Sequence, residues 1–139
     1  MNSPKDDSLE HIECDVLAEH SGARVVIRRT LTKVWEALGD RTQARFEPIM
    51  KRWCDGDKMT PEMFNHSEGR SSRHNIMLEA FKAFKVRLYG FSYAVGGKRT
   101  FIIVDADPAK KQNKADPKIL KRAKSRIDDL LDEKGTKGN

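Results

Sequence analysis

The sequence predicts an α+β fold in which an N-terminal helical hairpin packs on a small antiparallel sheet and a C-terminal helix follows. Three patterns support this prediction. Apolar residues recur at helical spacing from Leu31 to Leu38, strand-like alternation starts at Phe84, and a second helical stripe runs from Ile119 to Leu131. Helical spacing and alternation are the main local signals of the two kinds of element.

The helical hairpin is expected on either side of Gly39, which ends the first helix, while Asp40 begins the second. Each helix has one apolar stripe to bury: Leu31, Val34, Trp35 and Leu38 in the first, and Phe46, Ile49, Met50 and Trp53 in the second.

The sheet is expected to be antiparallel because Gly96-Gly97 is a strong signal for a two-residue hairpin turn. Side chains alternate along a strand. This alternation assigns Phe84, Val86 and Leu88 to the core face and Lys85, Arg87 and Tyr89 to an exposed face. The apolar run 99–105 is suited to a central strand, and Gly90 to a bulge.

The chain has 139 residues, which is enough for one domain. Residues 1–22 are expected to form a disordered leader, 23–132 a single domain and 133–139 a disordered tail. The N-terminus lacks the apolar segment of a signal peptide, and no apolar run is long enough to span a membrane. We therefore expect a cytoplasmic protein in which Cys14 and Cys54 are free thiols.

Positive charge is concentrated near the C-terminus. The net charge is +6, and the stretch from Lys98 to Arg126 contains ten basic and three acidic residues. A local excess of this kind attracts polyanions, most directly RNA. The alternative is a solvated helix face that only keeps the protein soluble.

Two groups of residues could carry chemistry. Lys85, Arg87 and Tyr89 share one strand face, which would suit a phosphate and a stacked base. The lysine-rich loop 107–116 follows the last strand and would suit a substrate's backbone. In each case the alternative is a group of solvated surface residues. His11, Cys14 and His20 do not have the spacing of a zinc site, so we expect neither a metal nor another cofactor.

The segments FKVRLYGF, GG and KRTFIIVDADPAKKQNKADPKILKRA resemble the RelE/ParE/HigB-like toxins of type II toxin–antitoxin pairs, in particular short members of phages and prophages. The order of elements also fits: two helices, an antiparallel sheet, a final strand, a basic loop and a helix. The resemblance covers residues 24–131 and is most specific over 84–123.

The resemblance implies a metal-independent endoribonuclease that cuts messenger RNA on the ribosome and is inhibited by a cognate antitoxin protein. The ribose 2′-OH attacks the adjacent phosphate, so a base, an acid and cations are needed. The implied catalytic residues are Lys85, Arg87, Lys111 and Tyr89. The residues implied to bind RNA are Arg99, Lys110, Lys114, Lys118, Lys121 and Arg122.

One departure from the family leaves an alternative open. Many members have a Tyr or His near the C-terminal helix, whereas this chain has neither after Tyr93. The alternative function is a non-catalytic phage-encoded module that binds nucleic acid or protein on the same fold. ParE-like members act on gyrase instead of RNA, and the sequence does not separate these targets.

Overall fold

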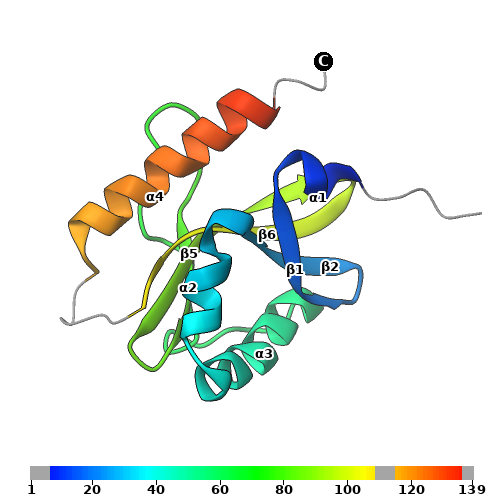
Figure 1. The fold of residues 1–139 in the computed structure, drawn as a ribbon, viewed down its shortest axis with the longest axis vertical. Helices are drawn as coiled ribbons and strands as arrows, with labels where there is room; N and C mark the ends of the chain where they lie inside the picture. The colour runs from blue at the N-terminus through cyan, green and yellow to red at the C-terminus, as the bar shows by residue number, and fades with distance from the viewer. Residues whose placement is uncertain (1–6, 109–114, 136–139) are drawn as a thin grey trace, which may run out of the picture.

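The computed structural model of the chain describes residues 7–108 and 115–135. It confirms the α+β class: a six-stranded mixed sheet has short helices from the N-terminal half on one face and a C-terminal helix on the other (Figure 1).

The strands lie in the order β1-β2-β6-β5-β4-β3. Their bounds are β1 Cys14–His20, β2 Ala23–Arg28, β3 Phe64–Asn65, β4 Glu79–Ala83, β5 Val86–Val95 and β6 Lys98–Asp107. The helices are α1 Asp7–His11, α2 Thr32–Ala37, α3 Asp40–Asp55 and α4 Pro117–Leu130, with a 3₁₀ turn η1 at Arg29–Leu31 and a π-helical turn η2 at Leu131–Gly135.

The sheet is mixed, so the prediction of a small antiparallel sheet is only partly right. β4, β5 and β6 form the expected antiparallel meander. β2, however, lies parallel to β6, with Val25 opposite Phe101. A helical crossover separates β2 from the meander, and connections of this kind join parallel strands.

The predicted turn between β5 and β6 is confirmed. Gly96 and Gly97 join β5 to β6, and both have positive φ angles, of 60° and 79°. Such angles are required at both positions of a type I′ turn. The register of β5 on β6 shifts between Tyr89 and Gly90, as expected for a bulge.

The prediction of a disordered leader over 1–22 is wrong for residues 14–20. β1 pairs with β2 along its whole length and forms one edge of the sheet. Its exposed Asp15 and Glu19 suit an edge strand, where one face remains in water, but they made the segment look unstructured. The Ser21-Gly22 turn was the overlooked hairpin signal.

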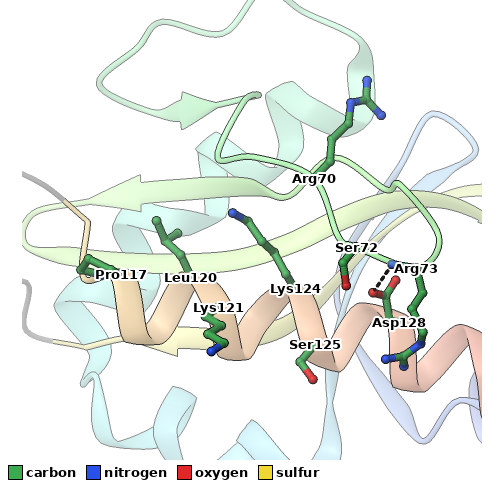
Figure 2. A pocket seen from close by; sticks show the side chains of 9 residues that line it. All are labelled: Arg70, Ser72, Arg73, Pro117, Leu120, Lys121, Lys124, Ser125 and Asp128. Carbon is green, nitrogen blue, oxygen red and sulfur yellow. Dashed lines mark hydrogen bonds between the residues drawn. The ribbon is translucent and has the colours of Figure 1, made fainter.

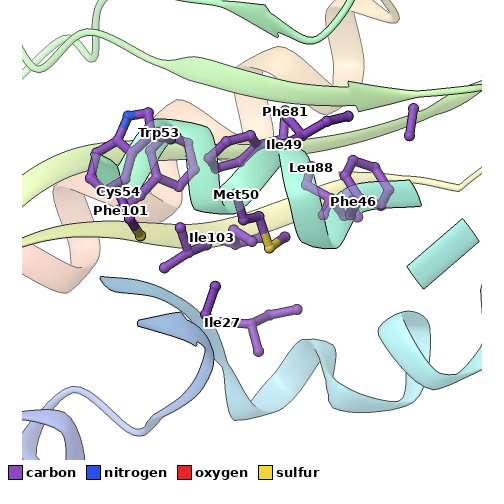
Figure 3. Packing of buried hydrophobic residues seen from close by; sticks show 14 of the residues in the cluster. Ile27, Phe46, Ile49, Met50, Trp53, Cys54, Phe81, Leu88, Phe101 and Ile103 are labelled. Carbon is purple, nitrogen blue, oxygen red and sulfur yellow. The ribbon is translucent and has the colours of Figure 1, made fainter. Parts of the chain in front are cut away.

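The sheet is buried on both faces. Towards α3, Phe101 and Ile103 of β6 pack with Phe46, Ile49 and Trp53 (Figure 3). Towards α4, the alternate β6 residues Ile102 and Val104 pack with helix residues that include Ala123 and Ile127. β6 is thus a central strand, as its apolar run predicted.

Two assignments of side chains in and beside β5 are wrong. Tyr89, expected on an exposed face, is completely buried under α4. Phe84, expected in the core, is 59% exposed because it lies in the two-residue turn between β4 and β5. Val86 and Leu88 are buried as predicted.

No helix within the described ranges is long and apolar enough to cross a membrane.

Trp53 should be the more important tryptophan for stability. Its ring contacts Phe81 and Phe101 edge-on, with centroids 6.4 and 5.6 Å away, whereas Trp35 is only half-buried. We expect Trp53→Ala to lower the free energy of unfolding by about 3–5 kcal/mol, measured by urea denaturation followed by circular dichroism. Trp35→Ala is the matched control and should cost less. An equal cost at the two positions would contradict this packing.

Candidate nucleic-acid-binding cleft

Helix α4 begins with the cap that the sequence predicted. The Asp116 side chain accepts a hydrogen bond of 2.9 Å from the backbone N–H of Lys118, and Pro117 occupies the first turn. The helix then lies across the sheet with Ala123, Ile127 and Leu130 buried. Other side chains of α4 face the sheet strand β6, the loop between β3 and β4, or water.

A buried carboxylate holds α4 on the sheet. Asp105 of β6 is 1% exposed and accepts two hydrogen bonds of 2.7 Å from Arg122. Arg126 lies 3.2 Å from the same carboxylate and donates to the carbonyl of Val104. A bidentate arginine pair fixes direction as well as distance, so this contact sets how α4 lies on β6.

A second carboxylate joins α4 to the loop at 70–76. Asp128 is buried and accepts hydrogen bonds of 2.9 and 3.1 Å from the backbone N–H groups of Arg73 and His74. Burial alone would raise the pKa of Asp128, but these N–H groups and the Ser71 hydroxyl hold it below its usual value. The Arg73 guanidinium adds ion pairs to Asp129 and Asp132.

The loop itself has a defined backbone structure. Arg70 and Met77 form an isolated antiparallel bridge. Ser71 donates its N–H to the Ile76 carbonyl at 2.8 Å, and its hydroxyl accepts from the Ile76 N–H at 3.0 Å. The loop therefore faces α4 in one arrangement, which is what a preformed binding site requires.

A cleft with a volume of about 440 Å³ lies between this loop and α4 (Figure 2). Among the described residues, its lining comes from the two elements: Arg70, Ser72 and Arg73 from the loop, and Pro117, Leu120, Lys121, Lys124, Ser125 and Asp128 from the helix.

The cleft is electropositive. Among residues 7–108 and 115–135, no carboxylate forms an ion pair with Arg70, Lys121 or Lys124. Arg73 is neutralised by its two aspartates, and Asp128, the only acid in the lining, is occupied by the loop's N–H groups. Lys121, Lys124 and two serine hydroxyls therefore face the cleft together with Arg70, whose guanidinium also donates to the Asn75 carbonyl at 2.8 Å.

Gly69 makes room for one of these cations. Any Cβ at this position would lie 2.5 Å from Nζ of Lys124, and the φ angle of 96° also favours glycine. Figure 2 shows Lys124 extending from α4 towards the loop that carries Arg70.

The chemistry of the cleft suits binding of phosphate groups. Lysine and arginine neutralise phosphate oxygens, and serine hydroxyls donate to them. The described part of the lining contains no histidine and only one carboxylate, which is already hydrogen-bonded, so none of these residues is placed as a general base. No group of three or more His, Cys, Asp or Glu within the described part of the chain could hold a metal ion.

The predicted catalytic residues do not form one exposed group. Arg87 is largely buried and lies 4.0 Å from Glu68, so its charge is not presented to solvent as expected. The Tyr89 hydroxyl is buried without a hydrogen-bond partner in the structure. Burial, and then the charge of Glu68, raise the pKa of Tyr89 to about 12, which makes it a poor base. Both differences arise because α4 and the 68–70 loop cover this face.

Of the other two predicted catalytic residues, only Lys85 belongs to the described part of the chain. Lys85 is exposed in the β4–β5 turn. Lys111 lies outside the described residues, as do Lys110 and Lys114 of the predicted RNA-binding set.

Two of the predicted RNA-binding residues have structural partners instead. Arg99 lies on the α3 face, where its guanidinium stacks 3.9 Å from the centre of the Trp53 ring and donates to the Cys54 carbonyl. Arg122 is bound to Asp105. Lys118 and Lys121 are exposed on α4 as predicted, and only Lys121 lines the cleft.

Sequence reasoning missed part of the cleft. Lys124 was included in the basic face of the last helix, but neither it nor Arg70 was chosen as a binding residue. Lys121, Lys124 and Ser125 recur at helical spacing, which was a usable signal. The loop residues Arg70 and Ser72 are about 50 positions away in sequence, and no local pattern joins them to the helix.

Comparison with known proteins identifies no relative. The chain matches no protein family, no curated protein and no solved structure.

Asp128 should make the stability of this region depend on acid. Its pKa is depressed below 3.8 in the folded state, so it stabilises the fold above the unfolded-state pKa and loses this effect as the pH falls through the folded-state pKa. We expect Asp128→Asn to lower the free energy of unfolding by about 1.5–3 kcal/mol at neutral pH. The difference from wild type should shrink in acid.

Urea denaturation at a series of pH values measures this effect. Asp129→Asn is the matched control, because Asp129 is exposed and pairs only with the Arg73 side chain among the described residues. A difference between wild type and Asp128→Asn that stays constant down to strongly acidic pH would be inconsistent with the proposed carboxylate–backbone contact.

Proposed function

We propose that the protein is an RNA-binding module that holds the phosphate backbone in the cleft between α4 and the 70–73 loop. The observation that carries the proposal is the convergence of Arg70, Lys121 and Lys124, from two elements far apart in sequence, without ion-pair partners among the described residues. The excess of positive charge from Lys98 to Arg126 supports the same choice of partner.

Binding is favoured over catalysis by the lining of the cleft. Phosphate contacts by lysine, arginine and serine position a nucleic acid without reading its sequence. A ribonuclease also needs groups that move protons, and the cleft offers none that is free. The proposal therefore corresponds to the non-catalytic alternative, with nucleic acid as the ligand.

The salt dependence of RNA binding tests the proposal. Each phosphate neutralised on a single strand contributes about 0.7 to the slope of log affinity against log salt concentration. We expect the double variant Lys121→Ala/Lys124→Ala to bind a single-stranded RNA more weakly at low salt. Its slope should be shallower by about 1.4, measured by fluorescence anisotropy.

The matched control is Lys33→Ala/Lys58→Ala, which removes the same charge from exposed positions outside the cleft. If the two double variants lose affinity equally, binding depends only on net charge and the cleft is not the site. A wild-type affinity that does not change with salt would exclude the nucleic-acid proposal.

A RelE/HigB-like endoribonuclease with a cognate antitoxin is the second candidate. The order of elements from α2 to α4 agrees with the one expected from the resemblance, and Arg87 and Tyr89 lie close enough to interact. The burial of Tyr89 and the location of Lys85 in a separate turn weigh against a working site in this arrangement.

Expression in a bacterial host separates the two candidates. For a binding module we expect no growth arrest and intact messenger RNA. An endoribonuclease would arrest growth, Arg87→Ala would relieve the arrest at equal expression, and coexpression of a cognate antitoxin would do the same. The variant Tyr89→Phe should be compared with Arg87→Ala. It keeps the buried ring and removes only a hydroxyl that has no hydrogen-bond partner among the described residues. Toxicity lost in Tyr89→Phe would show that this hydroxyl takes part in catalysis and would favour the enzyme.

A further inference from the structure

The turn between β4 and β5 displays an aromatic ring at an unusual position. Ala83 pairs with Val86, so the turn consists of Phe84 and Lys85 alone. Phe84 has a φ angle of 54°, whereas Lys85 is not among the residues with positive φ. A positive φ at the first position of a two-residue hairpin turn normally calls for glycine.

Packing does not explain a phenylalanine at this position. Its side chain is 59% exposed and belongs to neither buried cluster. A bulky residue with positive φ is a strained backbone choice, and such strain is often found at functional positions. The exposed ring is therefore a feature that the fold itself does not need.

The surroundings of the ring are cationic. The Arg41 guanidinium of α3 lies 4.7 Å from the centre of the Phe84 ring, Lys85 is the adjacent residue, and Arg45 is one helical turn beyond Arg41. All three cations are exposed, and within the described ranges none forms an ion pair with a carboxylate. An aromatic ring bordered by unpaired cations is the combination that holds a base together with its neighbouring phosphates.

The turn lies at the same end of the sheet as the start of α4, while its ring contacts α3 on the opposite face. Arg87 at the start of β5 pairs with Asp107 at the end of β6. Figures 1 and 2 both show the β4–β5 turn and the N-terminus of α4 at the same end of the sheet. Lys121 in the first half of α4 is thus on the side of the cleft that faces this end.

We propose that Phe84 stacks on an unpaired base of a single-stranded nucleic acid, with Arg41 and Lys85 contacting the adjacent phosphates. The inference rests on the proposed function and narrows its ligand to single strands, because the bases of a duplex are already stacked on one another. A protein partner is a poorer match: the other exposed large apolar residues, Val16 and Tyr93, lie on β1 and in the second half of β5, so Phe84 is not part of a broad apolar patch with them.

The test compares Phe84→Gly and Phe84→Leu with wild type, using a short single-stranded RNA that contains a fluorescent adenine analogue and a duplex of the same sequence. Stacking quenches the analogue. We expect both variants to bind the single strand about 5- to 150-fold more weakly, the range for one base–aromatic stack of about 1–3 kcal/mol, and to lose the quenching. Duplex binding should not change.

Melting temperatures show whether the variants bind RNA more weakly because their fold is less stable. Phe84→Gly places the preferred residue in the turn, so it should melt no lower than wild type. If either variant melts lower, Phe84→Tyr, which keeps the ring, should restore binding of the single strand at the wild-type level. Tyr93→Ser is the matched control for loss of an exposed aromatic ring elsewhere on β5.

Three results would overturn the inference while leaving the proposed function intact: unchanged affinity of the Phe84 variants for the single strand, an equal loss for single strand and duplex, or a change of oligomeric state without a change in RNA binding. Each of these results can occur together with weaker RNA binding by Lys121→Ala/Lys124→Ala, because that double variant tests the cleft separately. A wild-type protein that binds neither RNA would overturn both proposals.

Discussion

The strand β6 imposes the constraint on which the rest of the structure depends. It is apolar on both sides, with Phe101 and Ile103 towards α3 and Ile102 and Val104 towards α4. A strand of this kind is stable only where both faces are covered, and at roughly 25 cal/mol per Å² of buried apolar surface this burial is a main source of stability. The two helical layers satisfy this requirement, and pairing with β2 and β5 satisfies the backbone hydrogen bonds of β6.

Helix α4, which covers the second face of the sheet, also determines which charged side chains are accessible to a ligand. Arg122 and Arg126 are directed to the buried Asp105, and Asp128 is directed to the backbone of the loop. These contacts fix α4 against the loop, leaving Lys121 and Lys124 on the side where the two elements separate and form the cleft. Tyr89 is buried by the same helix. Tyr89, which the sequence predicted to be catalytic, thus belongs to the core that positions α4 and the cleft.

Local sequence signals predicted the elements that they define by themselves. The Gly96-Gly97 turn, the Asp116-Pro117 start of α4 and the β5–β6 meander are set by backbone preferences and short-range periodicity. β1 escaped notice because charged side chains are common on edge strands and its polar residues resemble those of a leader. The binding site was predictable only in part. The lysines of α4 lie in the basic stretch that the sequence shows, but Arg70 and Ser72 were not predicted to belong to the site, because they come from a loop that is distant in sequence.

The sequence by itself determined the fold class, the central strand and the location of the positive charge, since each depends on residue types that are close together in the chain. The tertiary structure was needed to show that both faces of β5 are covered over residues 86–91, which cations remain without ion pairs and which meet in a cleft. The physical reason is that alternation along a strand separates its side chains into two sets without saying whether a helix covers either set. In this protein α4 covers the side that carries Tyr89, and it brings Lys124 to the loop that carries Arg70.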